Sequence, residues 1–190
     1  MRILQRILLI AFFLFPLLCR AQENCPWMNA ATAGGILGGE VTAMVSHPNT
    51  PLPDMQAANV TSSAGPTSAD PSVASYAGNS VANADCAFIR RPPIAGALHI
   101  KVRTIGEPQK AFVSYTARCG ARGVPLQAIG NEAMTCDINK KSGQLSEQVV
   151  GRVRDQIFVI DLRTNDPSIT QSALREKAHT VAEIVAGNLF

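Results

Sequence analysis

Cysteine is the residue type here with the widest choice of chemistry, because a thiol can attack a substrate, bind a metal or form a disulfide. Beyond residue 21 the chain has four cysteines: Cys25, Cys86, Cys119 and Cys136. No pair has the C-x-x-C spacing of redox and zinc sites, and the histidines lie far from every cysteine in the sequence. Four cysteines in an exported chain favour two disulfides, for which three connectivities exist. We favour Cys25–Cys86 and Cys119–Cys136, with a metal site and a reactive Cys25 as the alternatives.

The histidines and carboxylates form no recognisable catalytic set. His99 is expected on the solvated side of a strand, His179 on the polar side of a helix, and His47 at the start of a Pro- and Ser-rich segment. Glu132 and Asp137 flank Cys136 at a spacing that places them on opposite faces. The G-x-S-x-G motif is absent from the sequence. We therefore predict no enzyme, no catalytic residue and no cofactor or metal, with a hydrolase of unrecognised site as the least favoured alternative.

The glycine-rich stretch ATAGGILGG, residues 31–39, lacks the G-x-x-x-x-G-K-[ST] pattern of phosphate loops. It is better explained as a short helix from Ala30 to Leu37, with Asn29 as its N-cap and Gly38 as its end. Gly34 and Gly35 each cost such a helix about 1 kcal/mol relative to alanine. We expect them to allow two backbone segments to approach closely.

Four basic residues are the candidate ligand or partner surface of this chain. They are Lys101, Arg103, Arg152 and Arg154. If they share one sheet face, they form a groove for an anionic ligand or partner. The simpler explanation is a solvated sheet face.

Alternation of apolar and polar residues predicts most of the strands that must position these groups. Strands are expected at 40–47, 85–91 and 96–105, and residues 128–138 are expected to form a turn at Gly130-Asn131 and then a strand, followed by a hairpin over 146–164. The hairpin is predicted to turn at Asp155-Gln156. Residues 107–120 favour a helix, with Pro108 in its first turn and Gly120 as its C-cap, although a strand is an alternative there.

The C-terminal segment is the clearest helix. Ser168 and Gln171 form a capping box. One apolar stripe consists of Leu174, Ala178, Val181, Val185 and Leu189, and the opposite side carries Arg175, His179 and Glu183. The order helix, strands, helix, strands, helix predicts an α+β fold, with helices over one face of an antiparallel sheet.

Residues 1–21 have the basic start, the apolar run and the small final residue of a signal peptide. Cleavage after Ala21 would remove three of the 17 basic residues and leave 14 basic and 14 acidic ones. Without net charge or a basic block, nucleic acid is not an expected partner. Residues 22–190 are expected to form a single domain, and its segment 47–80 is too poor in apolar residues to fold, which predicts a disordered insertion.

Several segments together resemble a known family. They are CPWMNAATAGGILGG, DCAFIRR, GNEA, VVGRVRDQIFVI and AHTVAEIVAGNL. Their order is similar to that of small exported lipoproteins and sensor-like domains of actinobacteria with PsbP-like α/β sandwich folds. The resemblance implies a curved antiparallel sheet packed by helices and a Cys25–Cys86 disulfide that pins the first helix. It implies no catalytic residues. The chain departs from this family in its extra pair, Cys119 and Cys136, and in Leu18, which stands before Cys19 where a lipidation signal has a small residue.

These features predict an exported, disulfide-stabilised, non-enzymatic binding module of the cell envelope or periplasm, whose partner is a small ligand or an envelope protein. We expect a secreted or periplasmic product without a stable membrane span. An uncleaved signal or a lipid on Cys19 would anchor it to the membrane instead. An alternative function is that of an envelope accessory or structural protein that contacts its partner through residues 47–80.

Overall fold

The computed structural model describes residues 24–46, 83–138 and 143–190. The predicted signal peptide, residues 1–21, and the predicted insertion, residues 47–80, both lie outside these ranges.

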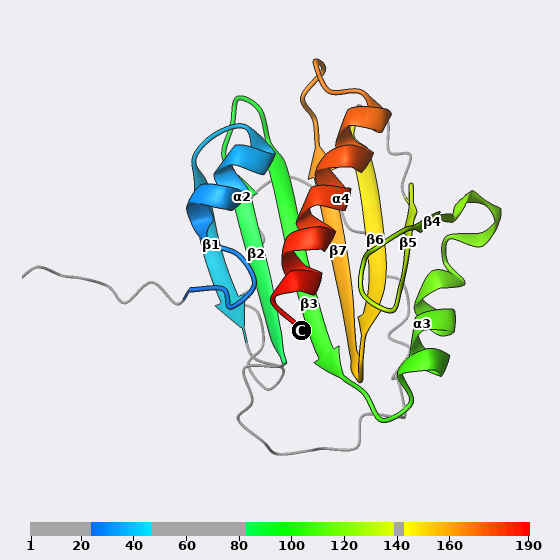
Figure 1. The fold of residues 1–190 in the computed structure, drawn as a ribbon. Coiled ribbons are helices and arrows are strands. Elements are labelled where there is room, and N and C mark those ends of the chain that lie inside the picture. Colours follow the sequence, from blue (N-terminus) through cyan, green and yellow to red (C-terminus); the bar gives the residue numbers. More distant parts are fainter. Residues whose placement is uncertain (1–23, 47–82, 139–142) are drawn as a thin grey trace, which may run out of the picture.

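The described residues build one antiparallel sheet of seven strands in the order β1-β2-β3-β7-β6-β5-β4 (Figure 1). The strands are β1 (Val41–Ser46), β2 (Ala84–Arg90), β3 (Gly96–Thr104), β4 (Val124–Leu126), β5 (Glu132–Cys136), β6 (Leu145–Val153) and β7 (Gln156–Thr164). Six of these agree with the sequence prediction, and the short edge strand β4 was not predicted. The two halves of the sheet join where β3 pairs with β7, from Gly96↔Thr164 to Thr104↔Gln156.

Helices cover both faces of this sheet, so the prediction of helices over one face is wrong. Helices α2 (Ala30–Leu37) and α4 (Gln171–Gly187) pack on one face, which we call the α2/α4 face. Helix α3 (Pro108–Thr116) packs on the other, which we call the α3 face. Neighbouring residues of a strand point to opposite faces. Val149 accordingly lies in the α2/α4 core, while Val150 lies beneath Phe112 of α3.

The core of the α2/α4 face contains side chains from the helices and five strands. Its largest fully buried members include Phe88, Leu98, Phe158, Ile160, Leu162 and Leu174. The predicted stripe of the C-terminal helix is buried here at all five positions. The α3 face has a much smaller buried cluster, formed by Phe112, Val150 and Ile157.

Helix α2 begins and ends as predicted. The Asn29 side chain accepts a hydrogen bond of 2.8 Å from the Thr32 N–H, and Gly38 ends the helix with a φ of 77°. The Gly39 N–H donates to Gly34 O over 2.9 Å, and a Cβ on Gly34 would lie 2.8 Å from Gly39 O. A Cβ on Gly35 would meet nothing within 4 Å. The close backbone approach therefore requires glycine at position 34 only.

Two basic side chains bind the last carbonyls of α2. Arg90 donates to Leu37 O and Lys177 of α4 donates to Ile36 O, each over 2.7 Å. Both cations thereby lie at the negative end of the helix dipole. Arg90 and Lys177 thus join α2 to the sheet and to α4.

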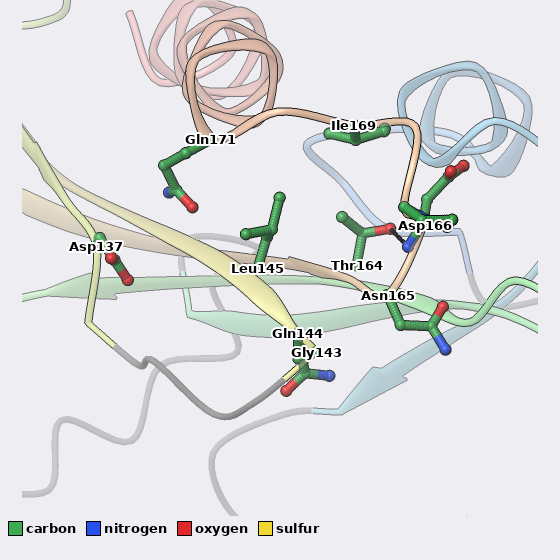
Figure 2. A pocket seen from close by; sticks show the side chains of 10 residues that line it. Asp137, Gly143, Gln144, Leu145, Thr164, Asn165, Asp166, Ile169 and Gln171 are labelled. Carbon is green, nitrogen blue, oxygen red and sulfur yellow. Dashed lines mark hydrogen bonds between the residues drawn. The ribbon is translucent and has the colours of Figure 1, made fainter.

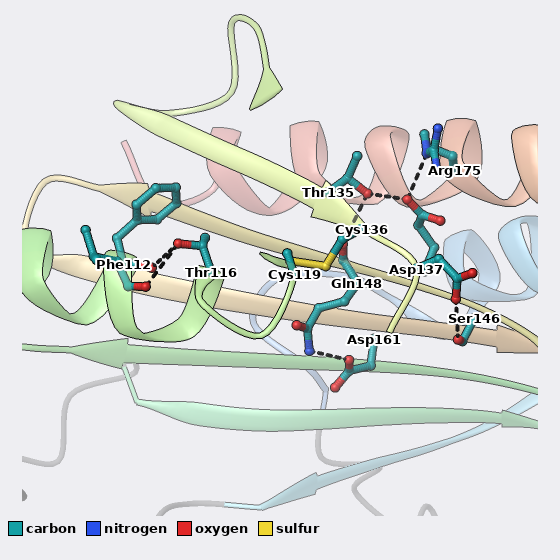
Figure 3. The surroundings of a disulfide bond; sticks show 12 residues. Phe112, Thr116, Cys119, Thr135, Cys136, Asp137, Ser146, Gln148, Asp161 and Arg175 are labelled. Atoms are coloured by element: carbon teal, nitrogen blue, oxygen red, sulfur yellow. Dashed lines mark hydrogen bonds and ion pairs between the residues drawn. A yellow bond between two sulfur atoms is a disulfide. The ribbon is translucent and has the colours of Figure 1, made fainter. Parts of the chain in front are cut away.

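The predicted disulfides are both present. Cys25–Cys86 has its two Cα atoms 5.7 Å apart and lies on the α2/α4 face. Cys119–Cys136, with Cα atoms 5.5 Å apart, connects β5 to the chain just beyond α3 (Figure 3). Each face of the sheet therefore has one disulfide.

Three predicted boundaries are shifted. Helix α3 ends at a cap on Ala117, and Gly120 instead opens a short 3-10 turn with a φ of 53°. The β6–β7 turn consists of Arg154 and Asp155, because Gln156 already pairs with Val153. The N-cap of α4 is Thr170, whose side chain accepts from the Ala173 N–H, since Ser168 is bound to Asp166.

Within the described ranges, none of the helices combines the length and the apolar character that crossing a membrane requires.

Candidate functional site

A cavity of about 590 Å³ lies at the end of the sheet where β6 begins, β7 ends and α4 starts (Figure 2). Its polar lining consists of Asp137, Gln144, Thr164, Asn165, Asp166 and Gln171. Its apolar lining consists of Leu145, Pro167 and Ile169. Leu145 and Ile169 also pack against the main core, which fixes the apolar part of the cavity to the body of the protein.

The wall on one side is a turn between β7 and α4. Thr164 is the last residue of β7, and its hydroxyl accepts a hydrogen bond of 3.1 Å from the Asp166 N–H. The Asp166 Oδ1 in turn accepts from the Ser168 N–H at 2.9 Å and from the Ser168 hydroxyl at 2.6 Å. Such local bonds from Asp and Ser side chains stabilise a turn and position the carboxylate within it.

Asp166 is held in its charged form. The hydrogen bonds from the side chain and the backbone of Ser168 lower the pKa of Asp166 below its usual value, because they stabilise the carboxylate. The Arg90 Nη1 atom lies 4.0 Å from Asp166 Oδ2 and makes its hydrogen bond to Leu37 O instead. The Asp166 carboxylate is therefore negative at neutral pH. Its ion pair with Arg90 is long, and the charges of Arg90 and Lys177 lower its pKa further.

Gln171 is fixed by a buried carboxylate behind the cavity. Glu147 of β6 is only 1% exposed, and its oxygens accept hydrogen bonds from the Thr135 hydroxyl at 2.6 Å, from Arg175 Nε at 2.9 Å and from Gln171 Nε2 at 2.6 Å. Gln171 Nε2 also donates to Ser146 O over 3.0 Å. Both amide hydrogens are thus used, and Oε1 remains as an acceptor on the cavity side.

The described lining is rich in hydrogen-bond acceptors and lacks a basic side chain. Asp137 contributes a second carboxylate, which accepts a long hydrogen bond of 3.5 Å from the Ser146 hydroxyl. Asn165 and Gln144 add amides to the lining. Lys140 and Lys141 belong to residues 139–142, which lie outside the described ranges.

The four predicted basic residues do not form one surface. Lys101, Arg103 and Arg152 share the α3 face, but Ile157 lies between the two arginines in register and is covered by Phe112. Arg103 pairs with Asp85 at 2.8 Å and Arg152 with Glu132 at 2.6 Å, which neutralises both cations. Arg154 lies in the β6–β7 turn, with its guanidinium 5.8 Å from the centre of the Phe190 ring.

The histidines are also separate from the cavity. His99 is half-buried on the α3 face, and burial lowers its pKa below the usual value. It lies opposite Asp161 in the neighbouring strand, and Asp161 Oδ1 accepts a hydrogen bond of 2.8 Å from Gln148 Nε2. His179 is 3.7 Å from Glu183 on α4, and His47 lies outside the described residues. In the part of the chain that the structure describes, no three potential ligands among His, Cys, Asp and Glu gather around a metal position.

No family model, curated protein or solved structure matches this chain. The PsbP-like resemblance therefore stays a prediction, and the cavity has to be interpreted from its own residues. Sequence reasoning missed these residues, although Asp166-Pro167-Ser168 has the composition of a turn that follows a strand.

Proposed function

We propose that this protein is an exported, disulfide-stabilised, non-enzymatic binding module of the cell envelope or periplasm, which holds a small ligand in the cavity beside α4. The cavity is the observation that carries this proposal. Leu145, Thr164 and Gln171 of its lining belong to β6, β7 and α4, and its other lining residues belong to the segments that join β5 to β6 and β7 to α4. Apolar residues with a few polar groups are the usual lining of a ligand pocket.

Export is supported by two independent features. Residues 1–21 have the pattern of a signal peptide, and two disulfides are typical of proteins that fold in an oxidising compartment. Mass spectrometry of the exported protein should give an N-terminus at Gln22 and no free thiol. A lipid-modified Cys19 at the N-terminus would instead show membrane anchoring.

Binding is tested by a thermal-shift screen of small polar metabolites, with a variant that fills the cavity. A ligand at 100 times its Kd should stabilise the protein by about 2.7 kcal/mol. Leu145→Trp should abolish this stabilisation, because the indole would occupy the space beside Gln171 and Ile169.

The matched control is Val113→Trp, which places the same side chain at a position on α3 that is 62% exposed and outside the cavity lining. Ligand stabilisation that persists in Leu145→Trp would place the binding site elsewhere. A screen without any hit that Leu145→Trp removes would contradict the proposed function.

A further inference from the structure

The two carboxylates of the cavity lie on opposite sides of its apolar lining. Asp137 follows β5, and Asp166 follows β7, while β6 lies between those strands. Two strand spacings, about 10 Å, separate β5 from β7 across the sheet. Strand β5 also ends level with Asp161, three residues before the end of β7 at Thr164, so the two strand ends are about 14 Å apart. Figure 2 shows Asp137 and Asp166 at the two sides of the view, with Leu145 between them. This separation is too large for both carboxylates to bind one metal ion.

The space between the carboxylates suits a hydrocarbon chain. Leu145 and Ile169 are half-buried apolar side chains in the lining, and Pro167 extends this surface toward Asp166. Methylene groups placed here would leave water without displacing a polar group from a partner. A ligand with polar groups along its whole length would leave them unpaired over this surface.

The acceptors at the two sides call for hydrogen-bond donors that carry positive charge. Asp166 is ionised, and Ser168 binds its Oδ1, while Oδ2 forms a long ion pair of 4.0 Å with Arg90 that leaves space for a closer donor. Gln171 adds a neutral acceptor whose orientation is fixed by Glu147 and Ser146. An anionic ligand would meet two like charges here and no cation among the described lining residues.

We propose that the cavity binds a linear aliphatic diamine or polyamine, with one ammonium group on Asp137, another on Asp166 and the methylene chain on Leu145 and Ile169. This inference rests on the proposed function and names the ligand class of the same site. An ammonium group has three donors and no acceptor, which matches a carboxylate with a neighbouring amide oxygen.

The test measures binding of four matched eight-carbon probes by isothermal titration: 1,8-diaminooctane, 1-aminooctane, 1,8-octanediol and suberate. Diamines of five to twelve carbons and spermidine extend the series to other spans. The best diamine should bind at least about fivefold more tightly than its monoamine, the factor that one partly screened ion pair supplies. The diol and the dicarboxylate should bind more weakly than the monoamine. Raising the salt concentration should weaken diamine binding most.

Three variants assign the contacts. Asp137→Asn and Asp166→Asn should each reduce the affinity for the diamine to that for the monoamine, because each removes one ionic end while keeping the side-chain size. Glu183→Gln, which removes an exposed carboxylate of α4 outside the cavity lining, should change neither affinity. Melting temperatures of all three variants verify that each is folded.

The outcomes separate the ligand class from the function. If Leu145→Trp removes binding of some other small molecule while diamines and diols bind equally, the diamine proposal is overturned and the binding function stands. If no probe of any class binds in a way that Leu145→Trp abolishes, both are overturned. Diamine binding that survives both Asp→Asn variants, or that is lost on K140Q/K141Q substitution, would likewise reject the assignment to Asp137 and Asp166.

Discussion

The two faces of the sheet hold their helices by different means. Both have a disulfide and a buried apolar cluster. On the α2/α4 face, the buried carboxylate of Glu147 takes hydrogen bonds from Gln171 and Arg175 of α4. On the α3 face, polar groups of the sheet bind one another, as in the pairs Arg103–Asp85, Arg152–Glu132 and Gln148–Asp161.

This difference shows which face depends on its helix. Without α4, Glu147 would lose two of its three partners, and a large apolar core would be exposed. Without α3, the ionic pairs of the sheet would remain, and only a small cluster around Phe112 would be lost. We therefore expect changes on the α2/α4 face to destabilise the protein more than matched changes on the α3 face.

The largest expected effect comes from removing one disulfide at a time. Cys25–Cys86 spans 61 residues and Cys119–Cys136 spans 17, so the chain-entropy model assigns them about 4 and 3 kcal/mol. Urea unfolding of C25A/C86A and C119A/C136A should show the larger loss for the first pair. A larger loss for the second pair would mean that the α3 face is the more dependent one.

Glu147→Gln should lower the free energy of unfolding by about 2–3 kcal/mol, because an amide donor would replace one of the two buried carboxylate oxygens that accept hydrogen bonds. The matched change on the α3 face is Glu132→Gln, whose partner Arg152 remains partly solvated. It should cost less than about 1 kcal/mol. Equal losses in chemical denaturation would contradict the contrast between the faces.

A pair of glycine substitutions examines α2 itself. Gly34→Ala should destabilise the protein by about 1 kcal/mol or more, since its Cβ would lie 2.8 Å from Gly39 O. Gly35→Ala should stabilise it by about 0.5–1 kcal/mol, because its Cβ meets open space and alanine favours the helix. Thermal unfolding should show melting temperatures that shift in opposite directions for the two variants. Shifts of the same sign would show that the Gly34–Gly39 contact does not determine the effect of a Cβ at position 34.

The smallest effect concerns acidification and the α3 face. Burial lowers the pKa of His99, so this side chain is neutral in the folded protein and takes up a proton more readily once unfolded. Its contribution to stability is full above pH 6.5, the usual pKa, and declines as the pH falls below that value. Asp161 opposes this shift, whereas Arg163 and Lys101 increase it. In His99→Gln, the free energy of unfolding measured between pH 7.5 and 5 should vary less with pH than in the wild type. An unchanged pH dependence would show that His99 is not its source.

The elements that the sequence predicted are those with a strong local pattern. The 146–164 hairpin, the β3 alternation and the buried stripe of α4 follow from residue periodicity alone. The side of the sheet on which α3 packs could not be predicted, because it depends on contacts of Phe112 with Val150 and Ile157, which are distant in the chain. Periodicity contains no information about such partners.

The cavity was missed for a related reason. Arg175 was expected on the solvated side of α4, but its Nε contacts Glu147, a carboxylate that lies between Leu145 and Val149 on the core side of β6. Asp137 and Asp166 are separated by 29 positions in the sequence, and they line the same cavity only because β5, β6 and β7 are adjacent in the sheet. Conversely, four basic residues that looked like one surface are divided by a helix and by ion pairs.

The Cys25–Cys86 bond also changes what a protease can do to this molecule. A single cut anywhere between these two residues, including in residues 47–82, yields two polypeptides that stay covalently joined. The β1–β2 ladder, from Val41↔Arg90 to Ser46↔Asp85, would continue to align the new partners. The domain can therefore exist as a two-chain protein of unchanged mass apart from one added water, and only a reductant would separate its parts.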